Sequence, residues 1–140
     1  RLISDYEVNN YILDKNLNSG EVGNVSAILM GDLAGKHPEI FAKEEVKDTT
    51  HISHATIKFS TVVLKDCAVS ITNFAKKLVA LPEISCVVFS KQGQSLNNEY
   101  ELYKNMVETS SIDALSLVGV AVYGDEETIK PLTKKFSVMK

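Results

Sequence analysis

Three apolar runs constrain the fold of this chain more than any other feature of its sequence. They are IKFSTVVL at 57–64, ISCVVF at 84–89 and LSLVGVAVYG at 115–124. Short continuous runs rich in β-branched residues are typical of strands that are buried on both faces. Because segments with helical periodicity separate these runs, the sequence predicts a central sheet covered by helices.

A further strand is predicted ahead of them, over residues 7–13, where β-branched and aromatic side chains recur. Behind it comes a polar turn, and apolar residues then follow at helical spacing from Val22 to Leu33. Ser19 is the expected N-cap of this helix, because its hydroxyl can accept from backbone N–H groups two or three residues on. The first unit of the chain is therefore strand, turn and helix.

Three more helices are predicted, with Asp66, Ser95 and Asp125 as their expected caps. The first of the three is amphipathic, with an apolar face made of Ile71, Phe74, Ala75 and Leu78. Pro131 should shorten or kink the last one, since proline lacks the backbone donor that a helix interior needs. The segment FSVMK at the end of the sequence is expected to add an edge strand.

The alternation of helices and strands predicts a single α/β domain over residues 1–140. We expect three layers, α/β/α, around a central mixed, mostly parallel sheet of four to five strands. In folds of this kind ligands bind beyond the carboxyl ends of the strands. The loops at 14–19, 65–66, 90–95 and 124–125 are therefore the predicted places for a site.

Composition narrows the class of protein. Hydrophobic and charged fractions of 44% and 24% are ordinary globular values, so disordered and fibrous classes are excluded. A net charge of −3 with scattered lysines argues against a nucleic-acid partner. No apolar run reaches the roughly 18 residues of a membrane span, and the two cysteines have neither metal nor disulfide spacing. We expect a cytoplasmic protein with no membrane partner, no metal and no cofactor.

The turn NSGEVGN at 18–24 is the first candidate site. Its glycines match neither dinucleotide nor phosphate-loop spacing, although a helix N-terminus is electropositive and can hold an anion. Asn24 is an unusual residue in the first turns of an amphipathic helix. Its amide either bonds a neighbouring loop or contacts a ligand, and in the second case Gly20, Gly23 and Asn24 form the predicted ligand-binding set.

The segment DTTHISH at 48–54 lies in the longest stretch without periodicity, which makes it the second candidate. A carboxylate near an imidazole can orient the ring for acid or base chemistry, so Asp48 and His54 are the predicted catalytic pair. The same residues with His51 lack a fourth ligand and helical spacing for a metal. A polar loop that bonds to itself is the alternative. Cys67, at a predicted helix start, has no visible base partner and is interpreted as structural.

Three segments resemble a family known only as a domain of unknown function, the two-thousandth in that series. They are LNSGEVGNVSAIL, KDTTHISH and the C-terminal LVGVAVYGDEETIKPLTKKFSVM, and the resemblance spans about residues 8–139. Gly20 and Asn24 match the family's glycine and helix-borne asparagine, and His54 matches its loop histidine. Gly119 and Gly124 match its paired glycines. The family's Asp-Gly turn is replaced here by Thr50-His51, and a glycine after the histidine becomes Thr56.

That family is similar in fold to the type II peptidyl-tRNA hydrolases, which implies the same fold here and a homodimer. Those enzymes carry Gly-Lys-Gly-Lys at the strand-to-helix turn, with a lysine implicated in activity. The equivalent stretch here is Gly20-Glu21-Val22-Gly23, so a carboxylate and an apolar residue replace the cations. Peptidyl-tRNA hydrolysis is therefore not expected.

Two hypotheses remain open on whether the protein is an enzyme. In the first, it binds an unknown small molecule at the turn between the first strand and the first helix, with Asn24 orienting the ligand and His54 closing the site. In the second, it is a hydrolase or transferase in which His54 acts as acid or base, Asp48 orients it, and Asn24 stabilises an anion. The second predicts that Asn24 and His54 face one cleft, with a carboxylate oxygen of Asp48 within hydrogen-bond reach of the imidazole. A His54 that points into solvent on the far side of the sheet would remove the basis of both.

Overall fold

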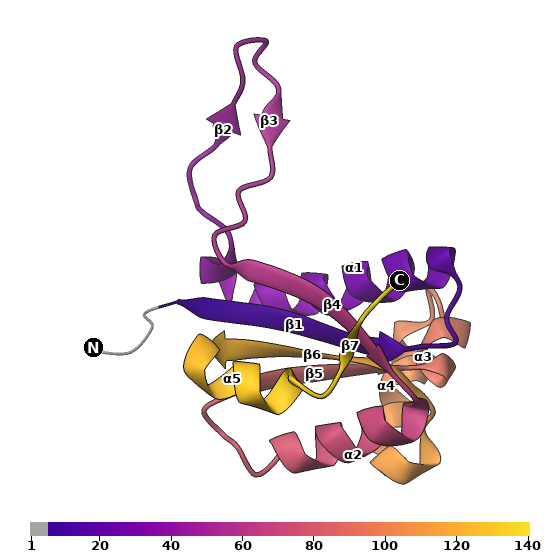
Figure 1. The fold of residues 1–140 in the computed structure, drawn as a ribbon. Helices are drawn as coiled ribbons and strands as arrows, with labels where there is room; N and C mark the ends of the chain where they lie inside the picture. The colour runs from indigo at the N-terminus through magenta and orange to yellow at the C-terminus, as the bar shows by residue number, and fades with distance from the viewer. Residues whose placement is uncertain (1–5) are drawn as a thin grey trace.

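The computed structural model describes residues 6–140, and within them a five-stranded mixed sheet forms the centre of the molecule (Figure 1). The strand order is β5-β6-β1-β4-β7. The strands are β1 (Glu7–Asp14), β4 (Ser60–Asp66), β5 (Ser85–Ser90), β6 (Leu117–Asp125) and β7 (Ser137–Val138). The predicted number of strands and the predicted C-terminal edge strand are both confirmed.

The strand directions differ from the prediction of a mostly parallel sheet. β1 and β4 are parallel, whereas the other three neighbouring pairs, β1–β6, β5–β6 and β4–β7, are antiparallel. The prediction was wrong because periodicity identifies strands without giving their direction. The strand directions also place the predicted site loops. The loops after β1, β4 and β5 lie at the same end of the strands, whereas the loop at 124–125, which follows β6, lies at the opposite end.

Helices cover both faces of the sheet, as the sequence predicted (Figure 1). The 18-residue α1 (Ser19–Lys36) packs on one face, where Val25, Leu29 and Leu33 are buried against Tyr11 and Leu13 of β1. The other face carries α2 (Ala68–Leu78) and α5 (Glu126–Thr133). Because side chains alternate along a strand, the two faces bury separate apolar clusters.

The start of α1 is one residue earlier than predicted. Asn18, rather than Ser19, is the N-cap: its Oδ1 accepts from Glu21 N at 2.9 Å, and Glu21 Oε1 accepts from Asn18 N at 3.1 Å. This reciprocal capping box satisfies two backbone donors and defines where the helix begins. The expected cap Asp66 was also wrong by one residue, because Cys67 precedes α2 and Asp66 ends β4.

The segment predicted as irregular contains a β-hairpin, which we call the arm (residues 41–58). After a short 3-10 helix (Pro38–Ile40), β2 (Val46–Lys47) and β3 (Ser53–His54) pair in antiparallel fashion. Figure 1 shows the arm projecting from the body beyond the C-terminal end of α1, and residues 43–55 are all exposed. Its two strands are too short to give a detectable period, which explains the missed prediction.

The run 84–89 forms β5, but this strand lies at the edge of the sheet and not in its centre. The helix expected after Ser95 is instead two helices, α3 (Lys91–Ser95) and α4 (Tyr100–Glu108). Asn98 between them has φ 67°, a left-handed conformation that ends a helix and that asparagine tolerates. A 3-10 turn (Ile112–Ala114) then leads to β6, which is buried along most of its length.

No helix within residues 6–140 has the length and apolar character that crossing a bilayer requires.

Candidate functional site

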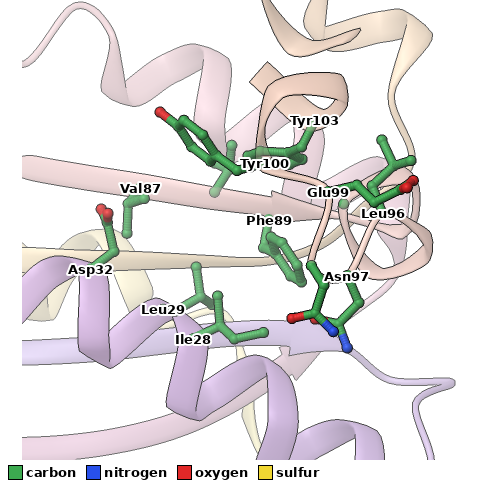
Figure 2. Close-up of a pocket in the computed structure, with 13 residues that line it drawn as sticks. Ile28, Leu29, Asp32, Val87, Phe89, Leu96, Asn97, Glu99, Tyr100 and Tyr103 are labelled. Atoms are coloured by element: carbon green, nitrogen blue, oxygen red, sulfur yellow. The ribbon is translucent and has the colours of Figure 1, made fainter. Parts of the chain in front are cut away.

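An apolar recess beside α1 lies between that helix, the edge strand β5 and the pair α3–α4, and we call it the α1 cavity. Its volume is about 440 Å³. Figure 2 shows Ile28 and Leu29 projecting from α1 toward Phe89 of β5, with Tyr100 and Tyr103 of α4 on the other side. A recess of this size with mostly apolar walls is suited to a small organic molecule.

Local packing explains why the cavity has rigid walls. Ser90 Oγ accepts from Gly93 N at 3.1 Å and caps α3. A Cβ atom at Gly93 would lie 2.6 Å from Phe89 Cε1 and 2.9 Å from Tyr103 Cε1, so only glycine lets α3 approach these rings. The two rings stand 6.4 Å apart at a tilt of 51°. The chain therefore holds an aromatic wall in place through a single buried glycine.

The polar groups of the α1 cavity are acidic or neutral. Asp32 and Glu99 supply carboxylates, Asn97 and Asn98 supply amides, and among residues 6–140 no Lys, Arg or His lines the cavity. Asp32 forms an ion pair with Lys36, at 2.7 Å, whereas Glu99 has no ion pair with any residue of the described chain. An apolar recess with carboxylates at its margin favours cationic or hydrogen-bond-donating ligands over anions.

The predicted ligand-binding residues lie in the first two turns of α1. Gly20, Gly23 and Asn24 are all exposed, and the Asn24 amide makes no hydrogen bond within residues 6–140. None of the three lines the α1 cavity. Asn24 precedes Ile28 by four residues, however, and side chains at this spacing are neighbours on one helix face. Asn24 therefore stands one turn from the cavity, toward the start of α1.

The predicted catalytic pair is in contact. His54 Nε2 and Asp48 Oδ2 lie 2.7 Å apart in the arm. Because an ionised carboxylate can only accept, Nε2 carries the hydrogen of this bond. Hydrogen bonds to Asp48 hold the pKa of its carboxyl below the usual range. The largest contribution comes from the Thr50 side chain, the next from His54, and smaller ones from the backbone N–H groups of Thr50 and Ile52.

The same contacts show what Asp48 does locally. Its Oδ1 accepts from Thr50 N at 2.8 Å, Thr50 Oγ1 at 2.6 Å and Ile52 N at 3.3 Å, so the side chain closes the turn of the arm. His51 at the tip has φ 68° and occupies the left-handed position that such a turn needs. The polar loop that bonds to itself is thus present together with the carboxylate–imidazole contact.

The structure does not bring Asn24 and His54 into one cavity. Asn24 lies near the start of α1, while the arm that carries His54 leaves the body beyond the end of that helix (Figure 1). The intervening helical residues span about 18 Å at 1.5 Å per residue. His54 is exposed, with 56% of its side chain open to solvent.

A second histidine–carboxylate contact lies near the end of α1. Glu39 Oε2 is 3.4 Å from His37 Nδ1 and accepts from the Tyr123 hydroxyl at 3.3 Å. Its own backbone N–H and then His37 lower the pKa of the Glu39 carboxyl, against partial desolvation. Burial, with the nearby acidic groups, raises the pKa of Tyr123. These contacts join the end of α1 to β6.

Cys67, interpreted as structural from the sequence, begins α2 with its thiol 3.4 Å from the Ser70 hydroxyl. Hydrogen bonding with the Ser70 side chain and backbone lowers the pKa of this thiol. No histidine or other base is hydrogen-bonded to the sulfur in the described part of the chain. Within residues 6–140, no three His, Cys, Asp or Glu side chains converge in the arrangement of a metal site.

Sequence reasoning missed two buried polar residues in the middle of β1. Asn9 is fully buried and its Oδ1 accepts from Tyr11 Oη at 2.8 Å and Thr61 Oγ1 at 3.1 Å. Asn10 is 8% exposed on the opposite face. Asparagine is depleted in strands, so the pair NN inside EVNNYILD was a usable signal. The residues of the α1 cavity gave no such signal in the sequence, because each one is of a type that commonly occupies its kind of position in a protein core or on a protein surface.

Comparisons with known proteins agree with this architecture. The structure of a protein of unknown function, Atu0240 from Agrobacterium tumefaciens strain C58, is similar, with a TM-score of 0.85. The two chains share 17% sequence identity, and the match covers 99% of this chain and 100% of that one. At such low identity the likeness shows the fold alone. No curated protein matches this sequence.

The resemblance seen in the sequence is confirmed at the level of the family. The family described as "Protein of unknown function (DUF2000)" matches residues 10–140, which is nearly the whole chain. This chain therefore belongs to the DUF2000 family.

Proposed function

We propose that this protein binds a small molecule with an apolar ring and an amino group in the α1 cavity. The observation that carries the proposal is the lining: aromatic and aliphatic walls with two carboxylates and no basic side chain. The ring would pack against Phe89 and Ile28. The cationic amine would be attracted to Glu99 and to the faces of the tyrosine rings.

Asn24 enters this proposal as a residue at the margin of the cavity. A ligand longer than a single ring would extend along α1 from Ile28 toward Asn24, whose amide has no partner within the described chain. Gly23 has nothing within 4 Å of a built Cβ position, and Gly20 meets only Asn18 Oδ1 at 3.4 Å. These glycines leave the start of the helix open to such a ligand.

A thermal-shift titration with phenethylamine tests the proposal, with phenethyl alcohol as the uncharged control of the same shape. Ligand at ten times Kd stabilises the folded state by about 1.4 kcal/mol. For a chain of this length that raises Tm by about 5 °C. The amine should give the larger shift, and the difference should shrink in high salt, because salt screens the carboxylates.

Two variants locate the binding. Ile28→Trp fills the cavity and should abolish the shift, whereas Val79→Trp places the same side chain at a site that is 85% exposed and outside the cavity. Equal shifts in both variants would place the binding elsewhere and refute the proposal. Asn24→Ala should leave Tm unchanged without ligand and weaken only ligands that reach beyond one ring.

The 2.7 Å contact of His54 with Asp48 favours a second candidate, a hydrolase or transferase. With Nε2 held by the carboxylate, Nδ1 of a neutral imidazole would be the base. We rank it second because exposed arm residues do not exclude water. Hydrolysis of p-nitrophenyl acetate that disappears in His54→Gln and persists in His51→Gln would support it.

We also propose three properties that follow from the sequence and the family resemblance. These are a fold of the type II peptidyl-tRNA hydrolases, a homodimer and a cytoplasmic location. Peptidyl-tRNA hydrolysis is not proposed, because Glu21 and Val22 stand where those enzymes carry lysine.

A further inference from the structure

A second cavity lies on the opposite face of the sheet, and we call it the α5 cavity. Its volume is about 620 Å³. Val62 and Leu64 of β4 form its floor together with Asn10 of β1, and Phe136 and Pro131 stand at its side. These floor residues face α2 and α5, whereas the α1 cavity lies beyond the other face.

Asn10 is the polar residue in the otherwise apolar floor of the α5 cavity. Its neighbours in register are Val62 on β4 and Val122 on β6, so one amide interrupts an apolar row. The side chain is more than nine-tenths buried, yet it reaches the cavity. A buried amide among valines is unfavourable unless both of its ends find hydrogen-bond partners.

Hydrogen bonds determine which end of this amide faces the cavity. Thr133 Oγ1 donates its proton to the backbone oxygen of Ile129 at 3.1 Å, so the hydroxyl oxygen can only accept a further bond. The Asn10 amide nitrogen donates to this oxygen at 3.2 Å. The carbonyl oxygen Oδ1 of Asn10 is turned away from Thr133 and has no donor within residues 6–140.

The charges around the α5 cavity are balanced. Glu126, Glu127, Lys130 and Lys134 surround its opening. Lys130 and Glu126 lie 3.9 Å apart, so part of this charge is already compensated. A mixed rim gives no strong preference for either sign of ligand charge, and the accessible Oδ1 of Asn10 at the floor, which is unpaired within residues 6–140, then selects a hydrogen-bond donor.

We propose that the α5 cavity is a second small-molecule site, which binds a neutral compound carrying an amide-type N–H on an apolar body. The N–H donates to Oδ1 of Asn10, and the apolar body packs on Val62 and Phe136. Thr133 is a positioning residue, because its accepted bond keeps the Asn10 oxygen toward the ligand. The site is independent of the α1 cavity, from which the sheet separates it.

The test is an NMR titration of the ¹⁵N-labelled protein with benzamide and with N,N-dimethylbenzamide. The two probes share a ring and a carbonyl, but only benzamide has N–H donors. Benzamide should give saturable shifts at the Asn10 side chain, Thr133 and the backbone of residues 129–134. Loss of one neutral hydrogen bond weakens binding about fivefold, which is the expected deficit of the dimethyl compound.

Variants distinguish specific recognition in the α5 cavity from nonspecific binding. Asn10→Leu keeps the number and branching of the side-chain heavy atoms but removes the acceptor, and it should weaken benzamide about fivefold while making the two probes equal. Val62→Phe fills the cavity and should abolish binding, and it serves as the test if Asn10→Leu does not fold. Val79→Trp, which lies outside both cavities, should leave the benzamide affinity unchanged. Equal affinities of the two probes for the wild type, or shifts that never saturate, would overturn the proposal.

Discussion

The close approach of α1 to the sheet can be tested at a single glycine, Gly119, in the middle of β6. A Cβ atom built there would lie 2.7 Å from Leu13 Cδ2, 3.0 Å from Leu29 Cδ1 and 3.1 Å from Val25 Cγ1. Each of these three side chains is at most 1% exposed and packs in the same apolar cluster. Leu13 and Val25 are fully buried, and only Leu29 borders open space, in the α1 cavity, so Gly119→Ala must displace α1 or force strained rotamers.

The magnitude follows from two opposing terms. Overpacking of a buried site costs about 1–3 kcal/mol. Replacing a strand glycine by alanine returns roughly 0.5–1 kcal/mol, because the unfolded chain loses freedom. We expect a net loss of about 1–2 kcal/mol in the free energy of unfolding, which for this length lowers Tm by about 3–7 °C. Since Leu29 also lines the α1 cavity, ligand binding there should weaken as well.

Gly124→Ala is the matched control, because it changes a glycine of the same strand in the same way. Its nearest contact would be Ile129 Cδ1 at 3.4 Å, an ordinary van der Waals distance. We expect a change within about 0.5 kcal/mol, toward greater stability. Urea denaturation followed by circular dichroism measures both variants, with m unchanged if the denatured state is unaffected. Equal midpoints for the two variants would refute the packing argument.

Four further outcomes concern the arm and the cysteines. Asp48→Ala should speed amide hydrogen exchange across residues 43–56 while Tm changes by less than about 1 °C, since the arm buries little surface; unchanged exchange would show that Asp48 does not hold the turn. Because the pKa of Asp48 is lowered in the folded arm, the turn should persist above the ordinary value of 3.8 and open as pH falls through the lowered value, as seen in the Thr50 amide signal. His51→Gly should slow exchange at the same turn, because glycine adopts φ 68° without strain; faster exchange would contradict this. Iodoacetamide should modify Cys67 before Cys86, because the pKa of the Cys67 thiol is lowered and its modification rate should rise with pH through a midpoint below 9.0. Desolvation of the Cys86 thiol raises its pKa to about 11, although the residue as a whole is exposed. Preferential labelling of Cys86 would contradict this expectation.

Local pattern predicted the elements of this fold well and its caps less well. The apolar runs became β4, β5 and β6, and the amphipathic helices α1 and α2 lie where periodicity indicated. The predicted cap Asp125 is confirmed, because its side chain accepts from Glu127 N at the start of α5. The caps of α1 and α2 were misplaced by one residue, because neighbouring Asn and Ser, or Asp and Cys, compete for the same position. Ser95 was wrong because it ends α3 and caps no helix. The arm was missed because paired segments of two residues carry no period.

The candidate site was predictable only in its parts. The contact of Asp48 with His54 joins residues six apart, and a short polar loop already suggests it. The α1 cavity joins Ile28 of α1 to Tyr103 of α4, and nothing in either local sequence points to the other. Gly119 shows the same limit. The glycine is visible in the sequence, but a side chain is excluded there because α1, almost a hundred residues earlier in the chain, packs against this position.

The sequence by itself determined which segments are strands and helices and which faces they bury, because side-chain periodicity is a property of neighbours along the chain. Tertiary structure alone decided the order and direction of the strands, the edge position of β5 and the two cavities, because these depend on pairing between distant segments. The orientation of the Asn10 amide is the sharpest case. A hydroxyl 123 positions away sets it, and only folding brings the two side chains together.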